Sequence, residues 1–304
     1  MRVGVIDVGS NSLRSLFGEI LEDQKFKKAG GELLTTRLGE GLSFKKALSE
    51  EAMRRTLKGL IDLRERINNY GAEDIYAFAT SAVRDAENGE EFLRRVFEET
   101  GIRVELLSGE EEALQNLLGV ETGLGVSDNY LLLDIGGGST EIAVKRGGEV
   151  FLKSFPIGAL KLKERFKGNL EDMLFFLERF WFEEASLLRS LSCKALNFIG
   201  MGGTLSALVS FKEGASFYDI KVVHGKKIEA MWLYRTVRFI SEISTEELKR
   251  RLVFEPDRAY ILLEGSTILL SLMSFLFIPE ILVSETNLLW GGLVKKWKVK
   301  GFVF

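Results

Sequence analysis

The chain has 304 residues and a mass of 34.2 kDa, which is long for a single hydrophobic core and favours two domains. Hydrophobic residues make up 46% of the chain and charged residues 28%, as in ordinary globular proteins. The net charge of −3 counts against a general nucleic-acid binder, so no nucleic-acid partner is expected, and a polyanionic substrate would need a local basic pocket.

The cysteine and histidine content narrows the possible chemistry. The single cysteine, Cys193, excludes an intrachain disulfide, and the single histidine, His224, excludes a zinc site of several His and Cys ligands. Catalytic bases and metal ligands should therefore be mainly carboxylates. No apolar signal segment opens the chain, and the most apolar stretch, residues 266–283, predicts a buried helix followed by a strand. We expect a cytoplasmic protein with no membrane partner.

The first half of the chain predicts alternating strands and helices. An apolar strand over residues 3–6 runs into the turn Asp7-Val-Gly-Ser-Asn-Ser-Leu-Arg14 and back into a strand. Apolar residues at helical spacing then predict helices. The expected helices cover residues 50–70, 90–99 and 110–118, and the expected strands cover residues 75–79 and 102–107.

The second half repeats this plan. A strand over residues 131–133 runs into Asp134-Ile-Gly-Gly-Gly-Ser-Thr-Glu141, a second copy of the first turn. Two copies suggest a duplicated domain, and the alternation predicts α/β layers. We expect an N-terminal α/β domain over residues 1–123, which the C-terminal helix in 289–304 could rejoin, and a C-terminal α/β domain over 124–304. The expected later elements are a helix over 170–191 and strands over 196–199 and 281–283.

The second turn has the composition of an anion-binding loop. Successive glycines let backbone N–H groups approach an anion, and neighbouring hydroxyls add donors. Asp134 and Glu141 offer oxygen ligands to a hard cation such as Mg²⁺. The alternative is a tight hairpin turn that binds nothing. The candidate phosphate-binding residues of this turn are Gly136, Gly137, Gly138, Ser139 and Thr140.

The first turn has the same layout with different side chains. Ser10, Asn11 and Ser12 stand where the second turn has glycines, and Arg14 stands where the second turn has Glu141. A guanidinium can donate two parallel hydrogen bonds to a phosphate. The alternative for Arg14 is an exposed surface residue.

Three further segments contain candidate functional residues. A glycine-rich loop that contains Gly202, Gly203 and Thr204 opens an apolar helix, whose free N–H groups could bind an anion. Ser81 and Arg84 predict either a capped turn or phosphate contacts. The segment Ser108-Gly-Glu-Glu-Glu-Ala113 matches a capping box, in which acidic residues are also favoured for structural reasons.

These segments, together with Val223-His-Gly225, occur in an order that resembles the exopolyphosphatase and guanosine pentaphosphate phosphatase family. The resemblance covers nearly the whole chain. It implies the two-domain actin-like ATPase and sugar-kinase (ribonuclease H-like) α/β fold, with an interdomain cleft for phosphate. It also implies that an acidic residue activates water, and by position in its motif this residue is Glu112.

The same resemblance implies a cofactor and a substrate. Asp134 and Glu141 would assist the base or, with Asp7, hold Mg²⁺, another divalent cation or K⁺. The substrate would be inorganic polyphosphate, shortened from its end, or guanosine pentaphosphate of the stringent response, cleaved at its 5′-γ-phosphate. Two rival functions are a kinase or ATPase on the same fold and a non-catalytic sensor of polyphosphate or an alarmone.

One segment departs from the family pattern. Where the family tends to have Val-Ser-Asp-x-Gly-Leu-Arg-Glu-Gly, this chain has Val283-Ser-Glu-Thr-Asn-Leu-Leu-Trp-Gly291, so Leu289 and Trp290 replace an arginine and an acid. This change could alter affinity or chain-length preference. A homodimer is a further expectation, with the aromatic pairs Phe175-Phe176 and Trp181-Phe182 either at its interface or in the core.

Overall fold

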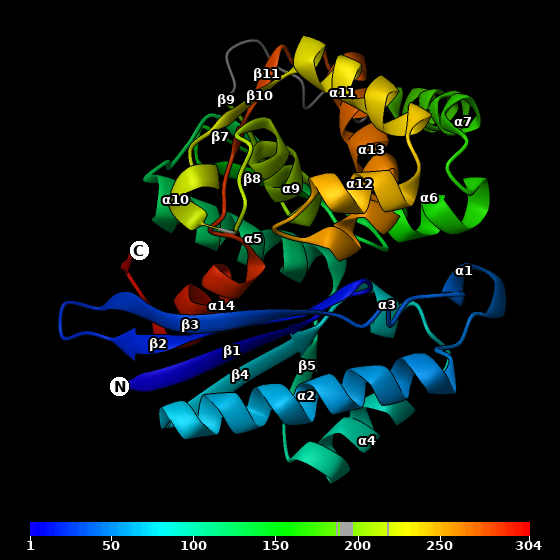
Figure 1. Cartoon of the computed structure of the whole chain (residues 1–304). Helices are drawn as coiled ribbons and strands as arrows, with labels where there is room; N and C mark the ends of the chain where they lie inside the picture. Colours follow the sequence, from blue (N-terminus) through cyan, green and yellow to red (C-terminus); the bar gives the residue numbers. More distant parts are fainter. Residues whose placement is uncertain (187, 189–196, 218) are drawn as a thin grey trace. The chain divides into compact units, whose positions relative to one another are not determined.

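The computed structural model describes residues 1–186, 188, 197–217 and 219–304, and it contains two six-stranded sheets flanked by helices (Figure 1). The predicted α/β class is therefore confirmed. Cys193, the end of the predicted helix 170–191 and the first residue of the predicted strand 196–199 lie outside the described residues.

The chain divides into two compact units, each built on one sheet. Unit 1 comprises Met1–Val126 and Thr286–Phe304, and unit 2 comprises Ser127–Glu285. The second unit is thus shorter than the range 124–304 expected from the sequence.

Contacts of the C-terminal segment explain why it belongs to unit 1. Gly123 lies against Thr286, and a side chain at position 123 would collide with that threonine. The Trp290 ring packs against Phe26 and Phe302, with ring centroids 5.9 and 4.6 Å away. Trp290, which replaces an acid in the family pattern, is therefore a core residue of unit 1.

The sheet of unit 1 is centred on its most buried strands. Val3, Val5 and Ile6 of β1 are fully buried because β1 pairs on both sides, antiparallel with β2 and parallel with β4. The strand order is β12-β3-β2-β1-β4-β5. The strands are β1 (Arg2–Val8), β2 (Ser12–Ile20), β3 (Lys25–Thr35), β4 (Asp74–Ala79), β5 (Val104–Leu106) and β12 (Gly301–Val303).

Helix α2 of unit 1 has a side-chain cap at its start and a glycine at its end. In α2, the Ser49 side chain accepts a hydrogen bond from the backbone N–H of Ala52, and Gly71 ends the helix with φ 82°. The helices of unit 1 are α1 (Leu42–Lys45), α2 (Glu50–Tyr70), α3 (Ser81–Arg84), α4 (Gly89–Thr100), α5 (Gly109–Leu124) and α14 (Leu288–Trp297).

The sheet of unit 2 repeats the pairing of unit 1. Its order is β10-β11-β9-β6-β7-β8, and β6, β7, β8, β9 and β11 pair as β1, β2, β3, β4 and β5 do, with the same parallel or antiparallel sense. The duplication inferred from two turns therefore extends over five strands. The strands are β6 (Tyr130–Ile135), β7 (Thr140–Arg146), β8 (Glu149–Phe155), β9 (Asn197–Met201), β10 (Lys227–Glu229) and β11 (Glu280–Val283).

The apolar segment near residues 266–283 is a buried helix and a strand, as predicted. No helix among the described residues is long and apolar enough to cross a membrane. The helices of unit 2 are α6 (Ala159–Phe166), α7 (Leu170–Glu183), α9 (Gly203–Lys212), α10 (Ile220–Val223), α11 (Ala230–Glu242), α12 (Thr245–Arg251), the 3₁₀ helix η1 (Pro256–Tyr260) and α13 (Leu262–Phe275).

The aromatic residues of α7 have two different roles. Trp181 is fully buried, and its Nε1 donates to the Ser271 hydroxyl at 2.9 Å. Phe175 and Phe182 are 64% and 71% exposed within the chain. The helix therefore contributes both to the core of unit 2 and to its surface.

Candidate functional site

The β1–β2 turn of unit 1 is held by backbone hydrogen bonds. The N–H of Gly9 donates to the carbonyl of Ser12 at 3.1 Å. The carbonyl of Ser10 accepts from Gly39, and that of Asn11 accepts from residues 36 and 37, at 2.8 to 3.1 Å. The loop after β3 therefore holds this turn in place through the carbonyls of Ser10 and Asn11.

The polar side chains of the β1–β2 turn are buried and bonded to one another. The hydroxyls of Ser10 and Ser81 lie 2.9 Å apart, and Nδ2 of Asn11 donates to the Ser12 hydroxyl at 3.0 Å. The structure thus brings Ser81, at the start of α3, to the turn. Arg14 is half-buried and lies opposite Asp7 in the β1–β2 ladder, so both side chains project from the same face of the sheet.

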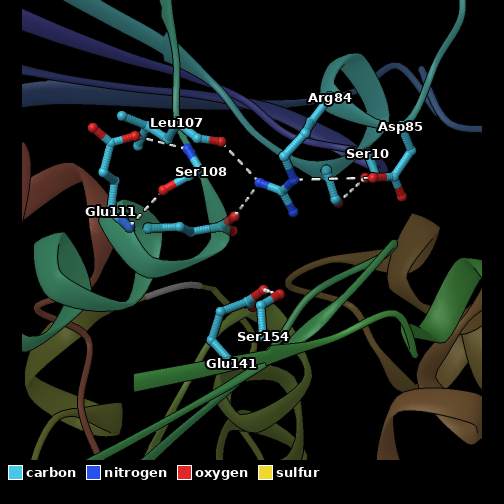
Figure 2. Close-up of polar contacts among 10 residues, drawn as sticks. Ser10, Arg84, Asp85, Leu107, Ser108, Glu111, Glu141 and Ser154 are labelled. Atoms are coloured by element: carbon cyan, nitrogen blue, oxygen red, sulfur yellow. Dashed lines mark hydrogen bonds and ion pairs between the residues drawn. The ribbon is translucent and has the colours of Figure 1, made fainter. Parts of the chain in front are cut away.

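The predicted capping box at the start of α5 is confirmed (Figure 2). The Ser108 hydroxyl accepts from the backbone N–H of Glu111 at 3.1 Å, and Oε2 of Glu111 accepts from the backbone N–H of Ser108 at 2.8 Å. The Ser108 backbone hydrogen bond lowers the pKa of Glu111 below its usual range. This local network sets where the first turn of α5 begins.

Glu112, the next residue of α5, is buried and paired with Arg84. Nη1 of Arg84 donates to Oε2 of Glu112 at 3.3 Å and to the carbonyl of Leu107 at 2.9 Å (Figure 2). Thr80 at the N-cap of α3 makes no side-chain capping hydrogen bond, so this short helical turn is held by backbone bonds. Arg84 connects the end of α3 to the Glu112 carboxylate.

The β6–β7 turn of unit 2 has the backbone plan of the β1–β2 turn. The N–H of Gly136 donates to the carbonyl of Ser139 at 2.9 Å. The carbonyls of Gly136 and Gly137 accept from the first N–H groups of α6, also at 2.9 Å. Gly158 permits this close approach, because a side chain there would collide with the Gly137 carbonyl.

With these carbonyls bound to α6, the N–H groups of Gly137 and Gly138 have no hydrogen-bond acceptor within the described part of the chain. Such adjacent amides are suited to an anion. The neighbouring hydroxyl of Thr140 differs, because it is fully buried and donates to the carbonyl of Ile157 at 2.7 Å. Ser139, also buried, completes the turn.

Two predicted carboxylates stand opposite one another in this hairpin. Asp134 pairs with Glu141 in the β6–β7 ladder, so both side chains project from one face of the sheet. Oε1 of Glu141 accepts from the Ser154 hydroxyl at 2.7 Å (Figure 2). Oδ1 of Asp134 lies against Gly202, 2.6 Å from where a Cβ would stand. Asp134 therefore borders both the β6–β7 turn and the third glycine loop.

The third glycine loop is tightly enclosed in unit 2. Gly202 has φ 93° and precedes α9, while Thr204 is 1% exposed and packs against Gly265 of α13. Gly203 lies against the guanidinium of Arg258, which is itself buried and bonded to Glu255 at 3.0 Å. No sequence motif marks Arg258, because an arginine in a short 3₁₀ helix carries no local signal.

The lone histidine has a structural partner in unit 2. Nδ1 of His224 accepts from the backbone N–H of Glu285 at 3.2 Å. The Glu285 carboxylate in turn accepts a hydrogen bond from the hydroxyl of Ser206 in α9. Among the described residues, no group of three or more His, Cys, Asp or Glu side chains is arranged to hold a metal ion.

The chain is similar to known proteins. Residues 22–298 match the family model described as the Ppx/GppA phosphatase family. The bifunctional 3-dehydroquinate synthase/phosphatase of Fusobacterium nucleatum is 34% identical over 95% of this chain and 46% of its own length. Exopolyphosphatase 1 of Mycobacterium tuberculosis is 36% identical over 53% of this chain and 48% of its own length. The chain thus spans about half the length of these two relatives.

Other relatives match from end to end. Exopolyphosphatase 2 of Mycobacterium tuberculosis is 27% identical over 95% of this chain and 97% of its own length. The solved structure of the Aquifex aeolicus Ppx/GppA family member superposes with a TM-score of 0.79 at 30% identity, covering 98% of each chain. An exopolyphosphatase structure from Cytophaga hutchinsonii gives 0.86 at 25% identity, covering 98% and 97%. The predicted actin-like α/β fold is confirmed.

Proposed function

The chain belongs to the Ppx/GppA phosphatase family, and we propose that it is an exopolyphosphatase that hydrolyses the terminal phosphoanhydride of inorganic polyphosphate. The observation that supports this substrate class most directly is the pair of adjacent amides in the β6–β7 turn, at Gly137 and Gly138, whose carbonyls are turned toward α6. Adjacent amides without an acceptor in the protein suit the oxygens of a phosphoryl group. Guanosine pentaphosphate, which ends in the same phosphoanhydride, is the second candidate substrate.

We assign Glu112 as the general base of this reaction. Its carboxylate would accept a proton from a water molecule while the water oxygen bonds to the terminal phosphorus. The bridging P–O bond then breaks, orthophosphate is released, and the shortened chain keeps the bridging oxygen. Arg84, which binds Glu112 and Leu107 in this structure, holds the carboxylate in one orientation.

Each unit has its own set of proposed contacts to substrate phosphates. In unit 1 the proposed contacts are Arg14 and the polar turn that precedes it; in unit 2 they are the β6–β7 turn and, more peripherally, the enclosed loop at the start of α9. Positioning and electrostatics dominate phosphoryl transfer, so these groups matter more than covalent chemistry. The proposed phosphate-binding set is Ser10, Asn11, Ser12, Arg14, Ser81, Arg84, Gly136, Gly137, Gly138, Ser139, Thr140, Gly202, Gly203 and Thr204.

The carboxylates of the β6–β7 hairpin fit a magnesium ion. Mg²⁺ is commonly held by one or two carboxylates together with water and substrate phosphates, and Asp134 and Glu141 supply two carboxylates on one sheet face. We propose these two residues as its protein ligands, with Asp7 of unit 1 as a further candidate. When bound, such an ion neutralises negative charge on the transferred phosphoryl group.

The test is orthophosphate release from long-chain polyphosphate and, separately, from guanosine pentaphosphate, each with and without Mg²⁺. Glu112→Gln should lower kcat by at least about 100-fold, since it removes the base. Glu110→Gln, on the exposed side of the same helical turn, is the matched control and should retain turnover. Tight polyphosphate binding without turnover by the folded wild-type protein would favour the sensor alternative, and near-normal turnover in Glu112→Gln would refute the assignment of the base.

A further inference from the structure

Helices α5 and α14 of unit 1 touch through their backbones. A Cβ on Gly119 of α5 would stand 2.5 Å from the carbonyl of Asn287 and 2.9 Å from the backbone nitrogen of Gly291. A Cβ on Gly291 would collide with the carbonyl of Gln115. No side chain separates the helices at these points, so their relative position is set to within a small distance.

Gln115 is the polar residue in this contact, and both ends of its amide are bonded. Its side chain is 1% exposed. Oε1 accepts from the Tyr76 hydroxyl of β4 at 3.2 Å, and Nε2 donates to the carbonyl of Leu288 in α14 at 2.9 Å. Burial raises the pKa of Tyr76 to about 12, so the phenol keeps its proton and remains a donor.

The position of Gln115 on α5 connects this contact to Glu112. Gln115, Gly119 and Gly123 follow at intervals of four residues, and Glu112 lies three residues before Gln115. Residues at such intervals share one side of a helix, so the stripe that faces α14 continues to Glu112. A rotation of α5 about its axis would therefore turn the Glu112 carboxylate.

The Tyr76–Gln115 hydrogen bond also joins α5, which supplies Glu112, to β4, the strand that precedes α3 and Arg84. Tyr76 lies in β4, which runs directly into α3 and Arg84, while Gln115 lies in α5 with Glu112. Two hydrogen bonds thus connect α5 to consecutive elements, one from Tyr76 of β4 and one from Arg84 of α3. Only the second involves the proposed base.

We propose that Gln115 is a positioning residue for Glu112. By bonding Tyr76 of β4 and the first turn of α14, it fixes the rotation of α5 at which the Glu112 carboxylate meets Arg84. Gln115 makes no contact with substrate in this proposal, which rests on the proposed role of Glu112 as the base.

The test compares kinetics of two mild variants in the full chain. Gln115→Met keeps the length of the side chain but removes both hydrogen bonds, and Tyr76→Phe removes only the hydroxyl. For polyphosphate hydrolysis, each should lower kcat by about 10-fold with KM within about twofold, because a displaced base slows the chemical step more than binding. Leu114→Ala, at an exposed neighbouring position, is the control and should match the wild type.

A double-mutant cycle distinguishes positioning from general loss of stability. Since both variants remove the Tyr76–Gln115 hydrogen bond, the double variant should be no slower than Gln115→Met alone. Wild-type kcat in both folded single variants, with only a lower Tm, would overturn the inference and leave Glu112 as the base. If Gln115→Met does not fold, as judged by circular dichroism, Tyr76→Phe decides. Full turnover in Glu112→Gln would instead overturn the assignment of the base and this inference together, while leaving the exopolyphosphatase activity itself in place.

Discussion

The β1–β2 turn of unit 1 and the β6–β7 turn of unit 2 share one backbone plan and carry different side chains. Each has a glycine N–H bonded to a serine carbonyl three residues later, at 3.1 and 2.9 Å. In each turn, two backbone carbonyls accept hydrogen bonds from the segment that follows the third strand of the sheet, β3 in unit 1 and β8 in unit 2. In unit 1 the turn is filled by buried hydroxyl and amide side chains, whereas in unit 2 glycines take these positions and the N–H groups of Gly137 and Gly138 have no acceptor among the described residues.

The residues that follow the turns differ in charge. Asp7 faces Arg14 across the first hairpin, and Asp134 faces Glu141 across the second. An opposite-charge pair is favourable at such positions, whereas like charges directly opposite are unfavourable. The first hairpin thus contains its own cationic side chain, Arg14. The second hairpin has two negative side chains, whose repulsion a bound cation would relieve.

The largest expected effect comes from removing the negative pair of unit 2. Asp134→Asn or Glu141→Gln should lower polyphosphate turnover by about 100-fold or more, because charge balance at the phosphoryl group is lost. Orthophosphate release across a Mg²⁺ titration measures the effect. Glu149→Gln, an exposed acid in β8, should leave the titration unchanged. An unchanged Mg²⁺ response in the two hairpin variants would exclude this pair as the cation ligands.

A smaller effect is expected from replacing Arg14, the cationic side chain of the unit 1 hairpin. Arg14→Gln should raise KM for polyphosphate by about 10-fold, as one charge-assisted contact is lost, while kcat changes less. Arg14→Glu copies the charge pattern of unit 2 and should raise KM further. Steady-state kinetics at constant ionic strength provide the measurement. Arg54→Gln, at an exposed site of α2, is the control, and equal KM values for all three variants would contradict the role of Arg14.

The buried hydroxyls of the unit 1 turn should affect stability modestly. Ser10→Ala removes the hydrogen bond to Ser81 and should lower the free energy of unfolding by about 1 kcal/mol. Urea unfolding of Ser10→Ala, Ser81→Ala and the double variant checks the pairing. The two single losses should not add, and strict additivity would mean that the hydroxyls act independently.

The smallest expected effect lies outside both turns, at the cap of α5. The pKa of Glu111 is lowered, chiefly by the Ser108 backbone hydrogen bond, so its ionised form favours the folded state. This contribution is present above the unfolded pKa, near 4.5, and is lost as pH falls through the lower folded value. Thermal unfolding should therefore find Glu111→Gln less stable than wild type at pH 7 but not at strongly acidic pH. A pH-independent difference would contradict this account.

Sequence patterns predicted the parts of the molecule that depend on local signals. Both turns, the capping box at Ser108 and the buried helix before β11 follow from glycine placement, cap residues and apolar periodicity. The sequence left open whether the C-terminal helix joins unit 1, because that placement depends on close contacts of Gly119 and Gly123 that exist only once α14 is present. Helical spacing alone also did not separate buried Trp181 from exposed Phe182.

The sequence predicted which residues form the candidate site better than it predicted the contacts between them. The position of Glu112 follows from its motif, but its pairing with Arg84 joins residues 28 apart and has no local sequence signature. Gln115 carries no motif at all, because its importance comes from Tyr76 and Leu288, which lie 39 positions before it and 173 positions after it. Such contacts require the tertiary fold.

The division of the chain also bears on the order of events during synthesis. Unit 2 is one continuous segment, whereas unit 1 needs residues from both sides of it. A ribosome therefore releases everything that unit 2 requires before it releases α14 and β12. Until then β3 has an open edge and the glycine face of α5 is bare, so the nascent first unit presents surfaces that other chains could occupy. Prompt emergence of the last nineteen residues, Thr286–Phe304, closes both surfaces.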